Sequence, residues 1–221
     1  TGSAGKTTTK ECIGVVLSQV FKVKVGFRNW NNYIGVPLNI LKLSEGDQCL
    51  VLELGANHKG EIGMLSEIAQ PTVGVITTIL PVHLEGFGSL EGVYKAKLEL
   101  ADYLDRSGGT LIASGDDPKL VERLQERKFS LITFGTKRSC DYVLSDLVVQ
   151  DGLIYFRVND RWEFRIRGYG AFNAMNALAA IATAGYFNLD LESISEAWQA
   201  LPKIEGRFHS DQIESCGILI V

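Results

Sequence analysis

The sequence has no apolar run near the ~18 residues that cross a bilayer, and its basic residues form no cluster. Its formal net charge is −4, with acidic and basic residues interspersed. A nucleic-acid-binding protein would need a clustered basic face. We therefore expect neither membrane insertion nor nucleic-acid binding.

Cysteine is scarce, and no two cysteines form a Cys-x-x-Cys pair. This spacing argues against a thiolate metal site and against a disulfide framework. We expect small core residues in a reducing compartment, which favours a cytoplasmic protein, and we see no secretory signal. The four cysteines are Cys12, Cys49, Cys140 and Cys216.

The most informative feature present is the opening decapeptide TGSAGKTTTK. It matches the end of the phosphate-binding pattern G-x-x-x-x-G-K-[ST], in which backbone N–H groups and a helix N-terminus surround phosphate oxygens. Lys6 would reach the β- and γ-phosphates, and the Thr7 hydroxyl would bind Mg²⁺. The alternative is a Gly-Ser linker before a helix. The predicted nucleotide-binding residues are Gly2, Ser3, Ala4, Gly5, Lys6, Thr7 and Thr8.

The full pattern needs a glycine just upstream of Thr1, and the strand that feeds the loop would also lie there. The tail at residues 217–221 (GILIV) is predicted to be a further strand. An apolar strand is an unusual natural terminus. We therefore expect the chain to be part of a larger protein.

Hydrophobic residues make up 46% of the 221 residues, enough for one or two domains with a sizeable core. The first part alternates apolar runs of strand length with amphipathic segments, which predicts a mostly parallel, doubly wound α/β sheet with helices on both faces. A first helix is expected from near Thr7, because Ile13, Val16, Leu17 and Val20 fall at i, i+3, i+4 and i+7. Strands are expected at 48–54, 72–79, 110–114 and 130–134, and helices at 62–69, 90–104 and 117–126.

After Cys140 the pattern changes to three β-rich runs joined by turn signals at hairpin spacing. We expect an antiparallel meander over about residues 141–167, appended to the main sheet. Its strands are expected at 142–149, 153–158 and 162–166, and helices follow at 173–186 and 191–201.

Two side chains and the phosphate loop are expected to share one edge of the sheet. Ligands of open parallel sheets bind beyond the carboxyl ends of the strands; Glu53 lies at the end of one apolar run, and His83 follows a second. With the phosphate loop they would form an Mg–ATP site. The alternatives are a plain strand-end carboxylate and a merely hydrogen-bonded histidine.

Lys97 falls on the apolar face of its predicted helix, in line with Val93, Leu100 and Leu104. Burial would lower its pKa and leave it open to chemical modification. The equally good alternative is a buried stem with its ammonium group in solvent.

Several segments in order closely resemble the Mur ligases, over essentially the whole chain. They are the opening decapeptide and residues 31–37 (NNYIGVP), 52–62 (LELGANHKGEI), 81–93 (PVHLEGFGSLEGV), 95–100 (KAKLEL) and 172–182 (FNAMNALAAIA). Residues 53–62 are most similar to the members that add D-alanyl-D-alanine to UDP-N-acetylmuramoyl-tripeptide.

The resemblance implies a role for each matching residue. Lys6 and Thr7 would hold the phosphates and a first Mg²⁺, with Glu53 as a further ligand of that ion. His83 would bind a second Mg²⁺. Lys97 matches a lysine that CO₂ carbamylates, which converts a cation into a carboxylate-like ligand. Lys6, His83 and Lys97 would thus act in catalysis by positioning and electrostatics, not as nucleophiles.

The resemblance also implies a base site and a γ-phosphate contact. Asn173 and Asn176 match an H-N-x-x-N element whose second asparagine contacts adenine. Phe172 stands where the histidine is usual, which leaves part of base recognition open. Arg207 resembles the arginine that approaches the γ-phosphate.

For the whole protein the resemblance implies a cytoplasmic, monomeric ligase of peptidoglycan synthesis. An acyl phosphate formed from ATP would be attacked by the amine of D-alanyl-D-alanine. Asn31 and Asn32 would lie on the substrate side. Residues 1–221 would be the central ATP-binding domain, and the UDP-substrate and C-terminal domains would lie outside this chain. The alternatives are a sister or folylpolyglutamate-type ligase with another acyl substrate, or a nucleotide-binding module without catalysis.

Overall fold

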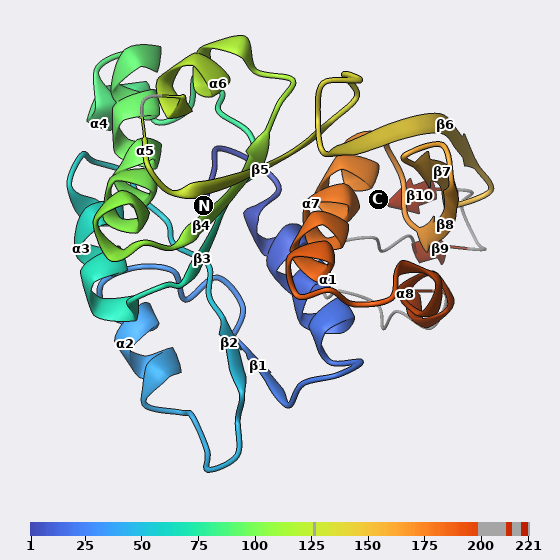
Figure 1. Cartoon of the computed structure of the whole chain (residues 1–221), viewed down its shortest axis with the longest axis horizontal. Coiled ribbons are helices and arrows are strands. Elements are labelled where there is room, and N and C mark those ends of the chain that lie inside the picture. The colour runs from blue at the N-terminus through green and yellow to red at the C-terminus, as the bar shows by residue number, and fades with distance from the viewer. Residues whose placement is uncertain (126, 199–210, 214–217, 221) are drawn as a thin grey trace.

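The computed structural model describes residues 1–125, 127–198, 211–213 and 218–220 (Figure 1). The helices within these residues are α1 (Lys6–Leu17), α2 (Gly35–Ile40), α3 (Glu61–Ala69), α4 (Leu84–Phe87), α5 (Leu90–Ser107), α6 (Pro118–Leu124), α7 (Phe172–Tyr186) and α8 (Leu191–Trp198). The strands are β1 (Val23–Val25), β2 (Cys49–Val51), β3 (Val73–Ile76), β4 (Thr110–Ser114), β5 (Ser130–Gly135), β6 (Tyr142–Gln150), β7 (Leu153–Val158), β8 (Trp162–Arg167), β9 (Asp211–Ile213) and β10 (Ile218–Ile220).

The main sheet has six strands in the order β3-β4-β5-β6-β7-β8. The pairs from β3 to β6 are parallel, and β6, β7 and β8 pair antiparallel. Only two residue pairs join β5 to β6, so the meander is a continuation of the parallel sheet at a narrow junction. Both expected turns have positive φ at their central residues, at Asp151-Gly152 and Asn159-Asp160.

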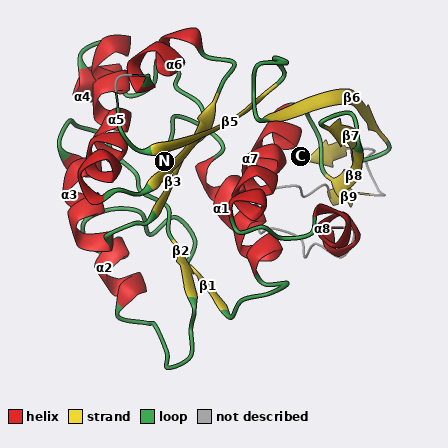
Figure 2. Cartoon of the chain, viewed as in Figure 1, coloured by secondary structure: helices red, strands yellow, loops and turns green. Residues whose placement is uncertain are grey.

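β4 explains why the sheet carries helices on both faces. All of its residues are buried, and alternate side chains enter different cores. Ile112 lies in the core with α1, α7, α8 and the meander, whereas Leu111 and Ala113 lie in the core with α3, α5 and α6. Figure 2 shows the sheet between these two groups of helices. The predicted α/β fold with helices on both faces is confirmed.

β1 and β2 form a separate parallel pair instead of joining the main sheet. A pocket of 410 Å³ lies between β2 and β3, lined by Leu50, Val51, Val73 and Val75 among others. At one end of it the Thr1 nitrogen donates to the Val75 carbonyl at 2.7 Å, and the Thr77 N–H donates to the Thr1 carbonyl at 3.0 Å. This alternation is the hydrogen-bond pattern of a parallel strand pair. The phosphate loop is thereby fixed to the end of β3.

Two helices begin at residues whose side chains cap their first turn. The Ser89 hydroxyl accepts from the Gly92 N–H at the start of α5. Asp117 accepts from the Lys119 and Leu120 N–H groups at the start of α6, with Pro118 in the first turn. α6 ends at Leu124, short of the expected residue 126.

The expected extent of the first helix is wrong at its C-terminal end. α1 ends at Leu17, and Val20 is 62% exposed, whereas Ile13, Val16 and Leu17 are buried. The apolar periodicity continues by chance to Val20, beyond the end of the helix. Cys12 and Cys140 are buried and Cys49 is half-buried; all three carry free thiols, and Cys216 lies outside the described residues.

None of the helices within the described residues combines the length and the apolar character that crossing a membrane would require.

Candidate nucleotide and metal site

The phosphate loop is anchored along the segment that follows β3. The Ser3 N–H donates to the Thr78 carbonyl at 2.7 Å, and the Ser3 hydroxyl accepts from the Leu80 N–H at 2.9 Å. The Thr77 hydroxyl donates to the Ala4 carbonyl at 2.6 Å. These hydrogen bonds from the segment after β3 hold the loop in its shape before any ligand binds.

Two glycines are required in this loop by space as well as by conformation. Gly2 and Gly5 have φ of +153° and +77°. A Cβ added at Gly2 would lie 2.1 Å from the Thr77 hydroxyl oxygen, and one added at Gly5 would lie 2.1 Å from the Asn176 amide oxygen. Within the described residues, no side chain caps the first turn of α1. Its N-terminal N–H groups and positive dipole end are therefore available for phosphate oxygens.

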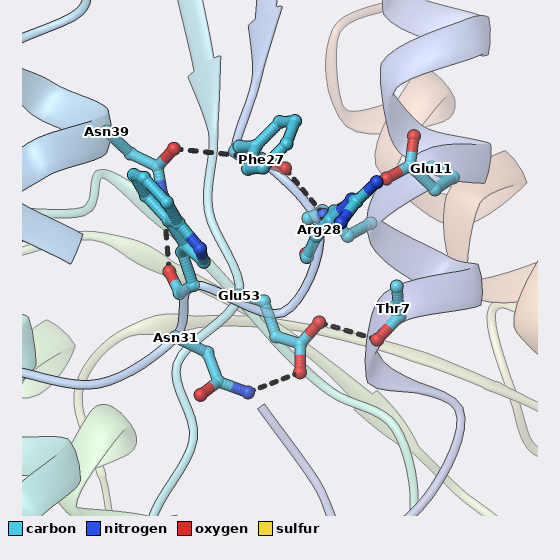
Figure 3. Close-up of polar contacts among 10 residues, drawn as sticks. Thr7, Glu11, Phe27, Arg28, Asn31, Asn39 and Glu53 are labelled. Atoms are coloured by element: carbon cyan, nitrogen blue, oxygen red, sulfur yellow. Dashed lines mark hydrogen bonds and ion pairs between the residues drawn. The ribbon is translucent and has the colours of Figure 1, made fainter. Parts of the chain in front are cut away.

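Thr7 and Glu53 meet beside this helix terminus. The Thr7 hydroxyl donates to Glu53 Oε2 at 2.7 Å, across 46 positions of sequence, and Asn31 Nδ2 donates to Glu53 Oε1 at 2.7 Å (Figure 3). Glu53 is 5% exposed. It follows β2, as expected, and a buried carboxylate in such a place needs these partners. The predicted meeting of the loop threonine with this carboxylate is present.

A pocket of 260 Å³ opens next to this pair. It collects residues that the sequence separates widely, and its polar lining comes from Lys6, Asn31, Asn32, Asn57, Glu61 and His83. His83 is exposed and directly precedes α4, with a left-handed φ of +50°. The prediction that Glu53 and His83 share one edge with the phosphate loop therefore agrees with the geometry, because Asn31 contacts Glu53 and lines the pocket with His83.

Lys97 lies on the buried face of α5, as its periodicity predicts, with only 2% of its surface exposed. Its Nζ lies 5.5 Å from the centre of the Phe87 ring. Burial, reinforced by the charge of Lys6, lowers the pKa of the Lys97 ammonium group from 10.5 to about 8. The alternative of an ammonium group in solvent is wrong.

Asn173 and Asn176 are buried on α7, and Asn176 connects this helix to α1. Asn176 Nδ2 donates to Asn173 Oδ1 at 3.3 Å, and the Thr9 hydroxyl donates to Asn176 Oδ1 at 3.4 Å. Asn173 Nδ2 donates to the Tyr169 carbonyl at 2.7 Å. The pair thus packs behind the phosphate loop, while Phe172 is 68% exposed.

The two asparagines of the NNYIGVP segment differ in what they contact. Asn32 Oδ1 accepts from the Ile34 and Gly35 N–H groups at 3.1 and 2.8 Å, in the turn that leads into α2. Asn31 binds Glu53 instead. Both line the pocket. Arg207 and His209 lie outside the described residues.

Sequence reasoning missed Lys10. Its side chain is 2% exposed, and its Nζ donates to the Gly26 and Arg28 carbonyls at 2.6 Å each and lies 3.0 Å from Glu11 Oε1. The signal was available, because Lys10 stands three and seven positions before the buried Ile13 and Leu17, on the same helical stripe.

The oxygen atoms of Thr7 and Glu53 suit Mg²⁺, which prefers hard oxygen ligands and usually keeps phosphate and water oxygens in its shell. Across the part of the chain that the structure describes, no group of three or more His, Cys, Asp or Glu side chains converges as a ready metal cage. The residues present therefore fit an ion that arrives with a nucleotide.

Comparison with known proteins identifies the family of the chain. Residues 1–184 match the family model described as Mur ligase middle domain. The chain is 39% identical over 207 residues to the UDP-N-acetylmuramoyl-tripeptide–D-alanyl-D-alanine ligase of Bacillus subtilis, covering 93% of this chain and 44% of the relative. It is 31% identical over 225 residues to the ligase of the same name from Escherichia coli, covering 100% and 50%.

Solved structures of related proteins have a similar fold. A crystal structure of MurF from Acinetobacter baumannii has a TM-score of 0.86 at 31% identity and covers 96% of this chain and 47% of that one. MurF ligase from Thermotoga maritima in complex with ADP has a TM-score of 0.85 at 27% identity and covers 96% and 50%. The chain thus spans about half the length of the relatives that it matches. By its sequence and its fold, the chain belongs to the Mur ligase family.

Proposed function

We propose that this chain is the central ATP-binding domain of a ligase that joins D-alanyl-D-alanine to UDP-N-acetylmuramoyl-tripeptide in peptidoglycan synthesis. The observation that carries the proposal is the contact of the Thr7 hydroxyl with the buried Glu53 carboxylate, at the mouth of a phosphate loop and beside a pocket lined by Lys6 and His83. The names of the relatives supply the substrates.

ATP is proposed to lie with its phosphates on residues 2–8. The Thermotoga relative is a complex with ADP, and the open N-terminus of α1 favours phosphate oxygens. Asn173 and Asn176 are proposed to place the adenine. Arg207, from outside the described residues, is proposed to approach the γ-phosphate.

Thr7 and Glu53 would hold a first Mg²⁺, and His83 with a modified Lys97 a second. When bound, Mg²⁺ supplies positive charge that offsets the charge of the triphosphate. An unmodified Lys97 ammonium group would repel a second ion, whereas a carbamate would offer oxygen ligands. CO₂ reacts with the neutral amine, and the low pKa of Lys97 makes that form accessible near neutral pH.

The chemistry proposed for the site is a phosphoryl transfer followed by an acyl transfer. Lys6 and the helix terminus draw charge from the γ-phosphate, so that a substrate carboxylate oxygen can attack its phosphorus while ADP departs. The amine of D-alanyl-D-alanine then attacks the acyl carbon, and phosphate leaves as the amine loses its proton. Asn31, Asn32 and His83 line the pocket in which we place the acyl group.

The segments beyond this chain are proposed to bind the UDP-sugar and the amine, because the relatives are about twice as long. A cytoplasmic, monomeric enzyme stays the prediction for the parent protein, and gel filtration checks the second part of it.

The decisive experiment measures ATP consumption by the intact parent protein with UDP-N-acetylmuramoyl-tripeptide, with and without D-alanyl-D-alanine. We expect phosphate release and amide product only with both substrates. The Lys97→Ala variant should lose turnover, and added short carboxylic acids should restore part of it. The Lys95→Ala variant, changed on the exposed side of the same helix, should keep its turnover. Turnover that needs a different acyl substrate would assign a sister ligase, and full activity of Lys97→Ala would contradict the proposed site.

A further inference from the structure

The Glu53 carboxylate is held at both oxygens by different elements. Oε2 accepts from Thr7 on α1, and Oε1 accepts from Asn31 in the loop between β1 and α2 (Figure 3). A carboxylate with one partner can rotate about its last bond. Two partners at 2.7 Å on opposite oxygens fix that rotation.

Asn31 itself is fixed by its backbone and by close packing. Its carbonyl accepts from the Gly55 N–H at 2.8 Å. A Cβ added at Gly55 would lie only 2.7 Å from Asn31 Cγ, so the amide lies directly on the glycine backbone. These two contacts fix how the segment that carries Glu53 lies against the loop that carries Asn31.

The segment just before Asn31 is held by hydrogen bonds from two helices. Lys10, on α1, holds the Gly26 and Arg28 carbonyls at 2.6 Å. Asn39, on α2 and 4% exposed, accepts from the Phe27 N–H at 2.9 Å and donates to the Trp30 carbonyl at 3.1 Å. These contacts, one buried and three partly buried, hold the segment just before Asn31 between the phosphate-loop helix α1 and α2.

We propose that Asn31 is a positioning residue for the Glu53 carboxylate, and that it sets the affinity of the site for the nucleotide-bound divalent cation. By occupying Oε1, the amide keeps Oε2 toward the Thr7 hydroxyl. That hydroxyl directs its proton to Glu53, which leaves its oxygen lone pairs for the ion. The inference rests on the proposed function and replaces a purely substrate-side role for Asn31.

The adjacent asparagine provides a matched control. Asn32 has the same side chain and lines the same pocket, but its amide oxygen accepts from N–H groups at the start of α2, and among the described residues its side chain makes no hydrogen bond with Glu53. A general disturbance of the loop would affect both substitutions alike. An effect transmitted through Glu53 belongs to Asn31 alone.

The test uses the intact parent protein with ADP and Mn²⁺ as the probe, and follows the paramagnetic resonance signal of free Mn²⁺. Removing a residue that orients a metal ligand typically weakens binding about 10- to 100-fold, and we expect this for Asn31→Ala. Asn32→Ala should leave Mn²⁺ binding within about threefold of wild type. In steady-state assays, Asn31→Ala should raise the Mg²⁺ concentration for half-maximal rate far more than it lowers kcat at saturating Mg²⁺.

The double variant separates positioning from folding. In a Glu53→Gln background, Asn31→Ala should add less than about a twofold further loss, because the carboxylate through which it acts is gone. If Asn31→Ala does not fold, Asn31→Ser replaces it, since the serine hydroxyl is too short to reach Oε1. Wild-type Mn²⁺ affinity in the Asn31 variant, or an equal loss in the Glu53→Gln background, would overturn the inference. Failure of the wild-type protein to bind Mn²⁺ with ADP would instead count against the proposed function.

Discussion

At the residue scale, Lys97 shows a conflict between stability and chemistry. Its ammonium group is buried against Phe87, with Lys6 near enough to lower its pKa further. Below pH 8 the folded and unfolded chains both carry the charge, and the folded chain bears the full cost of burying it. The site therefore keeps a group that weakens the fold, which is understandable if the neutral amine is needed for modification.

Lys97→Met should accordingly stabilise the protein near pH 7, in CO₂-free buffer. A tenfold change in proton affinity corresponds to about 1.4 kcal/mol, so the fall in pKa from 10.5 to about 8 sets an upper bound of roughly 3 kcal/mol. Between pH 8 and pH 10.5 the lysine of the folded chain is neutral while that of the unfolded chain is still protonated. Wild-type stability therefore rises with pH in this range, and the advantage of the variant shrinks. Urea unfolding at pH 7 and pH 10 measures both effects.

Lys95→Met, on the exposed side of α5, is the control and should change little at either pH. An advantage of Lys97→Met that is equal at both pH values would mean that side-chain packing, not buried charge, is responsible.

A residue's position or contact could be predicted from the sequence only where a local pattern specifies it. Lys97 was predictable because helical periodicity alone sets its face. The meeting of Thr7 with Glu53 was predictable because the carboxyl ends of parallel strands share an edge. The bond from Asn31 to Glu53 was not, since it depends on how the loop after β1 folds back, and no short-range pattern specifies that path.

At the element scale, Asp117 joins the start of α6 to α5. Its Oδ1 caps the Lys119 and Leu120 N–H groups at 3.1 Å, and its Oδ2 accepts from the Tyr94 hydroxyl at 2.6 Å. Burial, then the bond to Asp117, raises the pKa of Tyr94 to about 12. One carboxylate thus serves as a helix cap and as an interhelix contact.

Asp117→Ala should lower the free energy of unfolding by about 1–2 kcal/mol through the lost cap, with a further loss from the tyrosine bond. The pKa of Tyr94 should fall but stay above its ordinary value of 10, because burial, the larger cause, persists. Alkaline titration of phenolate absorbance against Tyr94→Phe, which removes only the hydroxyl, isolates the signal. An unchanged Tyr94 titration in Asp117→Ala would contradict this coupling.

The same scale shows where prediction of elements succeeded. β4 and β7 have the expected bounds, and α3, α5 and α7 begin within a residue of theirs, because central strands are continuous apolar runs and amphipathic helices have a strong period. β1 was missed because Val23–Val25 is too short to form a run, and α2 because Gly35 and Pro37 resemble a loop. β2 and β3 are shorter than the apolar runs that contain them.

At the scale of the whole molecule, the proposed function divides the reaction between this chain and the rest of the parent protein. The described residues supply the phosphate loop, the Thr7–Glu53 pair and a polar pocket, and the chain covers about half of its relatives. Transfer to an amine requires a second substrate aligned within contact distance of the acyl carbon, and that alignment contributes much of the rate. We expect the isolated chain to bind Mg–ATP weakly and to form no amide product from UDP-N-acetylmuramoyl-tripeptide and D-alanyl-D-alanine, whereas the intact parent forms it. Chromatographic detection of that product with the chain alone would place the acceptor site within these residues and contradict the proposed division of labour.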